Sequence, residues 1–272
     1  IKRLYRATSG KVLYKGQDIF SMNKAQAHQY AKNVQMIFQD PYSSLDPRMT
    51  VREIVREGML NHDICKGDRA AQDKRIGDLL QMVGLNAEHA DRFPHEFSGG
   101  QRQRIGIARS LAVEPEVIIC DEPTSALDVS IQAQVINLLK SLQEKFDLTL
   151  IFISHNLSLV KYISDRVGVM YLGSMVELST ADDLYEHPAH PYTQALISAI
   201  PIPDPVVQKD RKIIELKGDI PSPINTPDDA CSFASRCPYA TPECAGHPPR
   251  LEQVGENHFA TCDRVMKGEQ AV

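Results

Sequence analysis

The apolar positions in the middle of the chain change from a helical period to a short continuous run. Ile105, Ala108 and Leu111 recur at helical spacing, and Pro115 ends the amphipathic helix that they predict. The run VIIC at 117–120 follows almost at once. Such a run is typical of a parallel strand buried on both faces. The pattern therefore predicts a helix that leads into a central strand.

Similar patterns recur on both sides of this segment. The other predicted elements are strands over 11–14, 34–38 and 148–153, helices over 1–6, 51–59, 69–83 and 131–142, and a hairpin of 166–171 with 175–178. Strands that alternate with helices in this way indicate an α/β fold with a parallel sheet.

Polar residues stand at the ends of the two central elements. Ser98, Gly99 and Gly100 precede the helix, where free N–H groups and the helix dipole favour an anion such as phosphate. Asp121 and Glu122 follow the strand, at the edge where open α/β sheets bind their ligands. Asp121 would hold Mg²⁺, and Glu122 would polarise a water for attack on a phosphoryl group. A solvated acidic pair is the alternative interpretation of these two carboxylates.

These clusters together resemble the ATP-binding cassette (ABC) ATPases. Ser98-Gly99-Gly100-Gln101 is similar to the family signature, although Phe97 stands where the family most often has Leu. Residues 117–122 resemble the Walker B strand, and residues 125–128 resemble the D-loop that ends at Asp128. The resemblance implies a P-loop NTPase-like core with ATP and Mg²⁺ as cofactors. It also implies that two such domains sandwich ATP, so that Ser98 to Gln101 and the D-loop serve a composite site.

Two further positions gain a role from the resemblance. Gln39 follows the strand at 34–38 and by itself would suggest a turn cap. As the family's Q-loop glutamine it would touch Mg²⁺ and the attacking water. His155 follows the strand at 148–153 and resembles the H-loop histidine, which contacts the γ-phosphate.

Residues 41–111 are expected to form the helical subdomain of the ATPase. Its first loop carries candidate contacts to a membrane partner, with ordinary surface as the equal alternative. These candidates are Tyr42, Ser43, Leu45 and Met49.

The family's phosphate-gripping loop, G-x-x-x-x-G-K-[ST], does not occur in the sequence. We therefore expect a chain truncated at its N-terminus, because that loop should precede residues 1–6. Without it, the chain as given is expected to hold ATP poorly and to be inactive alone.

Proline becomes frequent after residue 180, which indicates an irregular, loop-rich extension over 181–272 behind an ATPase domain over 1–180. Residues 187–196, HPAHPYTQAL, resemble the C-terminal extension of ABC subunits from the oligopeptide, dipeptide and nickel importers. This resemblance narrows the expected function to import.

Four of the six cysteines lie in the extension, at Cys231, Cys237, Cys244 and Cys262. Four thiolates can hold a [4Fe–4S] cluster or Zn²⁺, and the lack of a CxxC pair slightly favours iron–sulfur. His247 and His258 remain possible substitutes for one thiolate. Reduced thiols packed as small apolar groups are the alternative, and disulfides are the weakest interpretation in a cytosolic protein.

Composition limits the remaining classes of function. A formal charge of -5 over 272 residues argues against a nucleic-acid partner. No apolar run reaches the length needed to span a bilayer, so a membrane link would pass through partners.

We therefore expect the ATPase subunit of an importer for oligopeptides or dipeptides, peripheral on the cytoplasmic face of the inner membrane. Its expected partners are a second ATPase subunit, favoured as a paralogue, two permease subunits and, indirectly, an extracytoplasmic solute-binding protein. A soluble ABC ATPase of DNA repair or ribosomes is one alternative. The other alternative is a non-catalytic fragment that only contributes its signature motif to the ATP site of a partner.

Overall fold

The computed structural model describes residues 1–201, 204, 209, 212–222, 230–245 and 250–262. The chain divides into two compact units, Ile1–His155 and Asn156–Val272. Each unit has its own sheet. The boundaries predicted from composition, at 180 and within 41–111, stay predictions.

Unit 1 is built on a parallel sheet in the order β3-β4-β5. Its strands are β3 (Val34–Ile37), β4 (Val117–Asp121) and β5 (Thr149–Ile153). Residue Asp121 at the end of β4 pairs with Ile153 at the end of β5, so the carboxyl ends share one edge. The three predicted strands are confirmed, and residues that follow them meet at that edge.

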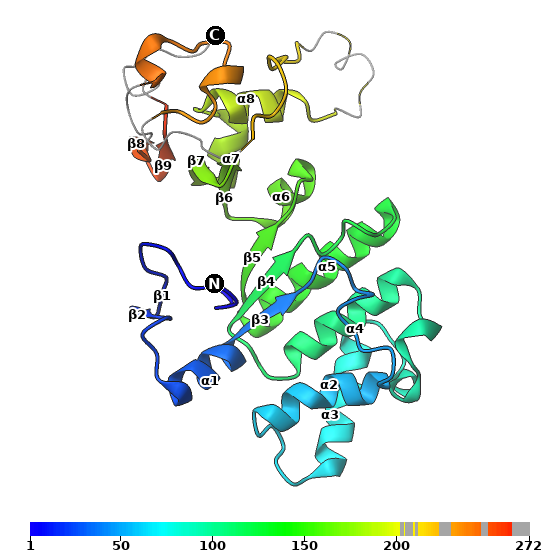
Figure 1. The fold of residues 1–272 in the computed structure, drawn as a ribbon. Helices are drawn as coiled ribbons and strands as arrows, with labels where there is room; N and C mark the ends of the chain where they lie inside the picture. The colour runs from blue at the N-terminus through cyan, green and yellow to red at the C-terminus, as the bar shows by residue number, and fades with distance from the viewer. Residues whose placement is uncertain (202–203, 205–208, 210–211, 223–229, 246–249, 263–272) are drawn as a thin grey trace. The chain divides into compact units, whose positions relative to one another are not determined.

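Helices of unit 1 follow the predicted periodicity closely. They are α1 (Lys24–Asn33), α2 (Val51–Asn61), α3 (Arg69–Met82), α4 (Gly99–Leu111) and α5 (Val129–Phe146), with the short helices η1 (Ala87–Asp91) and η2 (Pro94–Glu96) and the hairpin β1 (Leu13–Tyr14) and β2 (Gln17–Asp18). Thr50 and Glu53 form a capping box that starts α2. Figure 1 shows α2, α3 and α4 grouped together, and the buried side chains of Ile54, Val55 and Met59 form the face that α2 presents to them.

Two sequence predictions for unit 1 are wrong. Residues 1–6 form no helix, since one short turn gains too little without packing, and Tyr5 is exposed. The strand at 148–153 is not the buried strand that was predicted, because the residues of β5 are half-buried or exposed. Ile153 at its end is 48% exposed.

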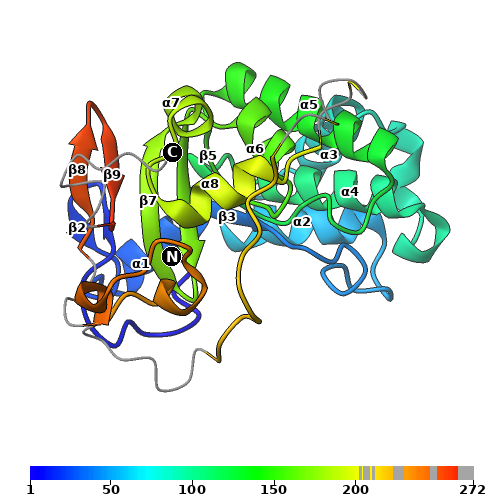
Figure 2. The same ribbon diagram turned by 90° about the horizontal axis from the view of Figure 1, so that it is seen from above.

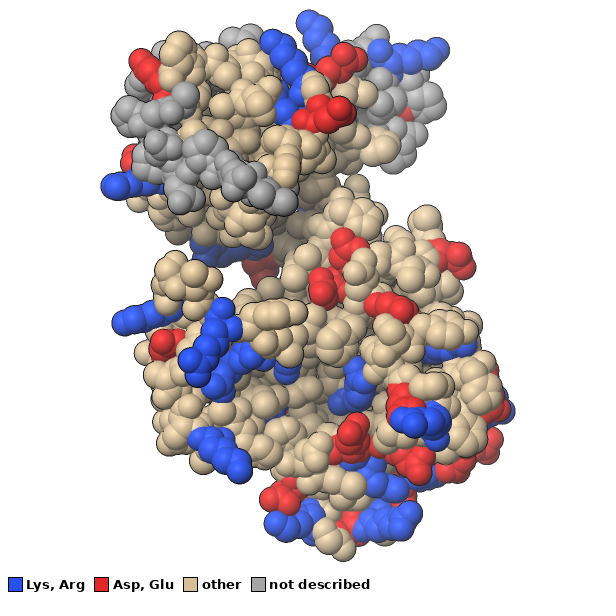
Figure 3. Space-filling view, in the orientation of Figure 1, with Lys and Arg blue, Asp and Glu red and all other residues tan. Residues whose placement is uncertain are grey.

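Charged side chains of both signs alternate on the lower part of unit 1 in Figure 3, where α2 and α3 lie in Figure 1. Arg52 of α2 holds Asp73 of α3 at 2.6 Å and Asp91 at 2.7 Å. Arg56 also pairs with Asp73. These ion pairs tie the helices of this part of the unit to one another.

Unit 2 is organised on an antiparallel sheet in the order β6-β7-β9-β8. Its elements are α6 (Leu157–Ile163), β6 (Arg166–Tyr171), β7 (Ser174–Thr180), α7 (Ala181–Glu186), α8 (Pro191–Ser198), the short helices η3 (Ala234–Arg236) and η4 (Pro242–Ala245), β8 (Glu252–Gly255) and β9 (His258–Ala260). The predicted hairpin of β6 and β7 is confirmed. The β8–β9 hairpin joins the exposed edge of β7, as Figure 2 shows.

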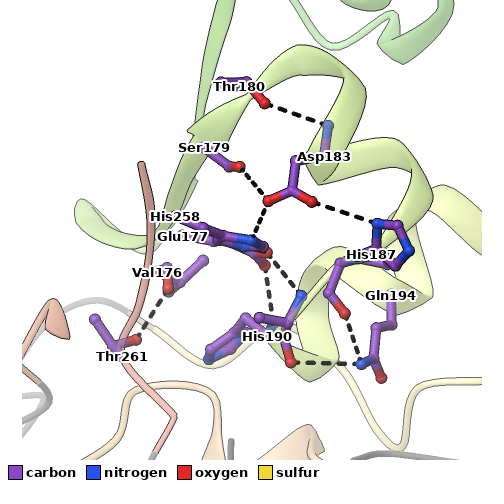
Figure 4. Close-up of polar contacts among 12 residues, drawn as sticks. Val176, Glu177, Ser179, Thr180, Asp183, His187, His190, Gln194, His258 and Thr261 are labelled. Carbon is purple, nitrogen blue, oxygen red and sulfur yellow. Dashed lines mark hydrogen bonds and ion pairs between the residues drawn. The ribbon is translucent and has the colours of Figure 1, made fainter. Parts of the chain in front are cut away.

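A buried charge network fastens this hairpin to β7 (Figure 4). His258 of β9 lies between Glu177 of β7, at 2.7 Å, and Asp183 of α7, at 2.8 Å. Glu177 is fully buried and also accepts the backbone N–H groups of Ala189 and His190. The network thereby connects the last strand to three segments that precede it by about seventy residues or more.

Aromatic side chains form the other part of this core. Phe233 is buried against Tyr171 of β6 and Tyr192 of α8, with ring centroids 5.3 Å apart in both pairs. This contact ties the cysteine-containing segment to the sheet of unit 2. None of the helices in the described ranges is both long and apolar enough to cross a bilayer.

Candidate functional site

Glu122 is the centre of a polar cluster at the carboxyl edge of the parallel sheet. Gln39, two residues beyond β3, donates its amide Nε2 to Glu122 Oε2 at 2.8 Å. His155, two residues beyond β5, places Nδ1 3.1 Å from Glu122 Oε1. The three residues come from three neighbouring strands, so the sheet register brings them together although they lie up to 116 residues apart (155 − 39).

The backbone of Glu122 adopts a left-handed conformation, with φ of 42°. This region costs a non-glycine residue on the order of 1–3 kcal/mol. The amide of Glu122 donates to the carbonyl of Ile153 at 3.0 Å, which helps to hold the turn. A carboxylate kept in a strained conformation at a sheet edge is a candidate for chemistry, and nothing in the sequence indicated the strain.

Asp121 and Gln39 supply hard oxygen atoms at the same edge, which suits Mg²⁺. Cys120, just before Asp121, is fully buried, and burial raises the pKa of its thiol to about 12. The thiol is therefore inert, and oxygen atoms remain the relevant ligands.

The segment beginning at Ser98 starts α4, as predicted. Ser98 and Gln101 form a capping box, in which the Ser98 amide donates to Gln101 Oε1 at 3.0 Å. The amides of Gly99 and Gly100 belong to the first turn, whose N–H groups have no intrahelical acceptor. This geometry suits an anion in front of the helix.

The two glycines lie against the segment that follows Glu122. A Cβ atom added at Gly100 would come within 2.5 Å of Ile131 Cγ2, and one at Gly99 within 3.5 Å of Leu127 Cδ2. Asp128 caps α5 there, without a side-chain bond to the helix. The structure thus brings the predicted signature beside the predicted D-loop, but not into contact with Glu122.

The loop after Gln39 is ordered by Asp40, whose carboxylate accepts the amides of Tyr42 at 2.8 Å and Ser43 at 3.3 Å. These bonds hold the pKa of Asp40 below its usual value. Tyr42 is 66% exposed, whereas Leu45 is 2% exposed. Of the proposed partner contacts, Leu45 is therefore wrong, because it belongs to the core.

Sequence reasoning missed two arginines that touch this loop. Arg102 is buried and lies over the ring of Tyr42. Arg109 donates to the carbonyl of Ser44. Arg102 and Arg109 are seven residues apart, so both lie on one face of the helix. This spacing is the feature of the sequence that could have shown that they contact the same loop.

None of the six cysteines, all of which lie in the described residues, forms a disulfide. The amide of Cys231 donates to the carbonyl of Cys244 at 2.9 Å. Burial, and secondarily the neighbouring thiols of Cys244 and Cys262, raise the pKa of Cys231, and Cys237 behaves likewise.

The four thiols are therefore neighbours, but among the described residues no three acidic, thiol or imidazole groups adopt a metal-binding arrangement. His258 is no substitute ligand, since carboxylates occupy both of its ring nitrogens. His247 lies outside the described residues.

Comparison with known families and relatives agrees with the geometry. Residues 1–125 match the ABC transporter family, and residues 176–244 match the oligopeptide/dipeptide transporter C-terminal region. The chain is 52% identical over 269 residues to a putative oligopeptide transport ATP-binding protein, YkfD, of Bacillus subtilis, covering 99% of this chain and 81% of that protein. It is 52% identical to the oligopeptide transport ATP-binding protein OppF of Salmonella typhimurium, over 96% and 78% of the two chains.

Solved structures show the same fold. The ATP-binding cassette MJ0796, a dimer in a post-hydrolysis state bound to ADP and Pi, aligns with a TM-score of 0.58 at 26% identity, covering 66% of this chain and 77% of that one. The cbiO1 protein of Clostridium perfringens, part of an ABC transporter complex, aligns with a TM-score of 0.60 at 24% identity over 68% and 72%.

Proposed function

Because the chain belongs to the family of ABC transporter ATP-binding subunits, we propose that it binds and hydrolyses ATP to drive import of oligopeptides or dipeptides. One observation carries the proposal: Glu122 is held between Gln39 and His155 at the carboxyl edge of the sheet. The relatives are transport proteins, which favours import over a role in DNA repair or on ribosomes.

The residues around Glu122 have separate roles in ATP hydrolysis in this proposal. ATP supplies the transferred phosphoryl group, and Mg²⁺ supplies charge neutralisation. In the proposed site Asp121 and the side-chain oxygen of Gln39 would hold Mg²⁺. Glu122 orients the attacking water and accepts its proton, and His155 steadies the γ-phosphate.

The first turn of α4 serves a second subunit in this proposal. Ser98, Gly99, Gly100 and Gln101 form a helix N-terminus that presents amides and a positive dipole end. Asp128 lies beside this turn, at the start of α5. Both elements would face the nucleotide of a partner ATPase, favoured as a paralogue, so one turnover requires two chains.

The loop after Gln39 is the proposed link to the membrane. Tyr42 is exposed in this loop, and Phe38 is exposed just before Gln39, the proposed Mg²⁺ ligand. Exposed aromatic side chains are frequent anchors of protein interfaces. We place two permease subunits on this side of unit 1, with the chain peripheral on the cytoplasmic face, and with the solute-binding protein reached only through the permeases.

The cysteine cluster is the proposed site of a metal cofactor. Four neighbouring thiols suit a [4Fe–4S] cluster or Zn²⁺, and metal binding would draw Cys231, Cys237, Cys244 and Cys262 together. Quantifying iron, acid-labile sulfide and zinc in anaerobically purified protein distinguishes the two metals. Protein that contains neither metal would contradict this part of the proposal.

Nucleotide binding tests the function. A fluorescent ATP analogue with Mg²⁺ should bind a version extended upstream through a G-x-x-x-x-G-K-[ST] loop, and bind the 272-residue chain only weakly. Equal binding by both forms would mean that the phosphate groups are bound by another part of the chain. Co-purification with integral membrane subunits separates the importer from the soluble alternative.

A further inference from the structure

Arg102 joins two loops that flank the proposed catalytic machinery. Its guanidinium carbon lies 3.7 Å from the centre of the Tyr42 ring. On its other side Nε donates to the carbonyl of Pro94 at 2.7 Å, in the short helix η2 that precedes the signature. The side chain is 6% exposed, so this cation is held between an aromatic face and backbone carbonyls.

A second set of contacts fastens the same loop to α4. Arg109 donates to the carbonyl of Ser44, and its guanidinium carbon lies 5.8 Å from the centre of the Phe38 ring. Ser110 donates its hydroxyl to the carbonyl of Met36 at 3.2 Å. One helix therefore contacts the end of β3, Phe38 and, in the loop that starts at Gln39, both Tyr42 and Ser44.

The loop has a different partner at its start. Gln39 donates to Glu122, which belongs to the end of β4 and not to α4. Residues 39–44 thus connect the sheet edge, at one end, with the signature helix at the other. Tyr42 and Ser44 are the residues through which α4 contacts this loop.

We propose that Arg102 and Tyr42 act as a positioning pair, which makes the engagement of Gln39 with Glu122 depend on the position of the signature helix. The proposal rests on the proposed function, since it gives the pair a role in ATP turnover. In this proposal neither Arg102 nor Tyr42 contacts the nucleotide. Arg102 sets the loop, and the loop sets Gln39.

The stack requires a planar cation. A guanidinium can lie flat on a ring and donate to a carbonyl at its edge, whereas the ammonium of Lys cannot do both. Tyr42 is two-thirds exposed, so shortening its side chain leaves the core intact. These properties make Tyr42→Leu and Arg102→Lys informative, with Tyr42→Phe as a control that keeps the ring.

The experiment measures kcat and KM for ATP in the assembled transporter. Loss of a cation–π contact is expected to lower kcat by about 3- to 30-fold in Tyr42→Leu, with KM within about twofold. Tyr42→Phe should stay within about twofold of the wild type. Because both residues act through one contact, Tyr42→Leu/Arg102→Lys should be no slower than the slower single variant.

Multiplying effects in the double variant would overturn the proposal, because the effect of Tyr42 on turnover would then not pass through its contact with Arg102. Normal turnover in Tyr42→Leu would overturn it as well. Glu122→Gln, measured in the same way, distinguishes failure of this proposal from failure of the proposed function. If Glu122→Gln retains turnover, the proposed function has failed, whatever the Tyr42 variants show.

A spectroscopic variant covers the case in which Arg102→Lys does not assemble. The chain contains no tryptophan, so Tyr42→Trp introduces its only indole. Subtracting the wild-type spectrum isolates this emission in the transporter. The proposal predicts that ATP with Mg²⁺ shifts the emission as the loop moves, and an unchanged spectrum would contradict it.

Discussion

Replacement of His258 by alanine should loosen the C-terminal hairpin of unit 2. The imidazole is almost fully buried and bridges Glu177 and Asp183, as Figure 4 shows. His258→Ala therefore removes a buried imidazole and both of its contacts with carboxylates at once.

The structure sets the size of the effect. Breaking a buried ion pair by removing one partner costs about 3–5 kcal/mol. Glu177 keeps the backbone amides of Ala189 and His190 at 2.7 and 2.8 Å, which offset part of that loss. We therefore expect His258→Ala to cost about 2–4 kcal/mol.

Hydrogen exchange at the amides of β9 measures this directly and does not require both units to unfold together. His187→Ala is the matched control. His187 is 3.3 Å from Asp183, but its side chain is 73% exposed, so its loss should cost less than about 1 kcal/mol. Equal exchange rates in the two variants would refute the reasoning that burial gives the network its strength.

Three further predictions concern single residues. Burial lowers the pKa of His190 from 6.5 to about 4. As pH falls, the unfolded state therefore binds a proton before the folded state does, and folding becomes less favourable. On the order of 3 kcal/mol of stability should be lost between pH 6.5 and pH 4. His190→Asn keeps an N-cap on α8 and should flatten this pH dependence in urea titrations; an unchanged slope would contradict the assignment. Gly100→Ala should cost about 1–3 kcal/mol and lower ATP turnover, because its Cβ meets Ile131; wild-type stability and turnover would exclude the clash. Cys120 should resist alkylation in the folded chain and react after denaturation, as mass spectrometry can follow; rapid labelling of the native protein would disprove its burial.

Periodic segments were predictable from the sequence for a physical reason. The apolar residues that predicted α4 and β4 are also buried in the structure. Ile105 and Ile118, for example, both belong to the core. Polar residues at strand ends were also predictable, because parallel strands place their carboxyl ends together. The contact of Gln39 and His155 with Glu122 agrees with that expectation.

Long-range packing was not predictable from local pattern. His258 and Glu177 lie 81 residues apart, and no periodicity relates them. A charged side chain on a helix is usually solvated, yet Arg102 is buried. The left-handed conformation of Glu122 follows from its three-dimensional surroundings, which local propensity does not encode.

ATP turnover by the assembled transporter with Glu122→Gln tests the central claim most directly. Glu116→Gln is the matched control, because Glu116 is an exposed glutamate that pairs with Lys15 just before β4, at the opposite end of that strand from Glu122. If Glu122 is the general base, Glu122→Gln should lower kcat by about 10²- to 10⁴-fold, and Glu116→Gln should turn over normally. Turnover by Glu122→Gln at the wild-type rate would contradict the account.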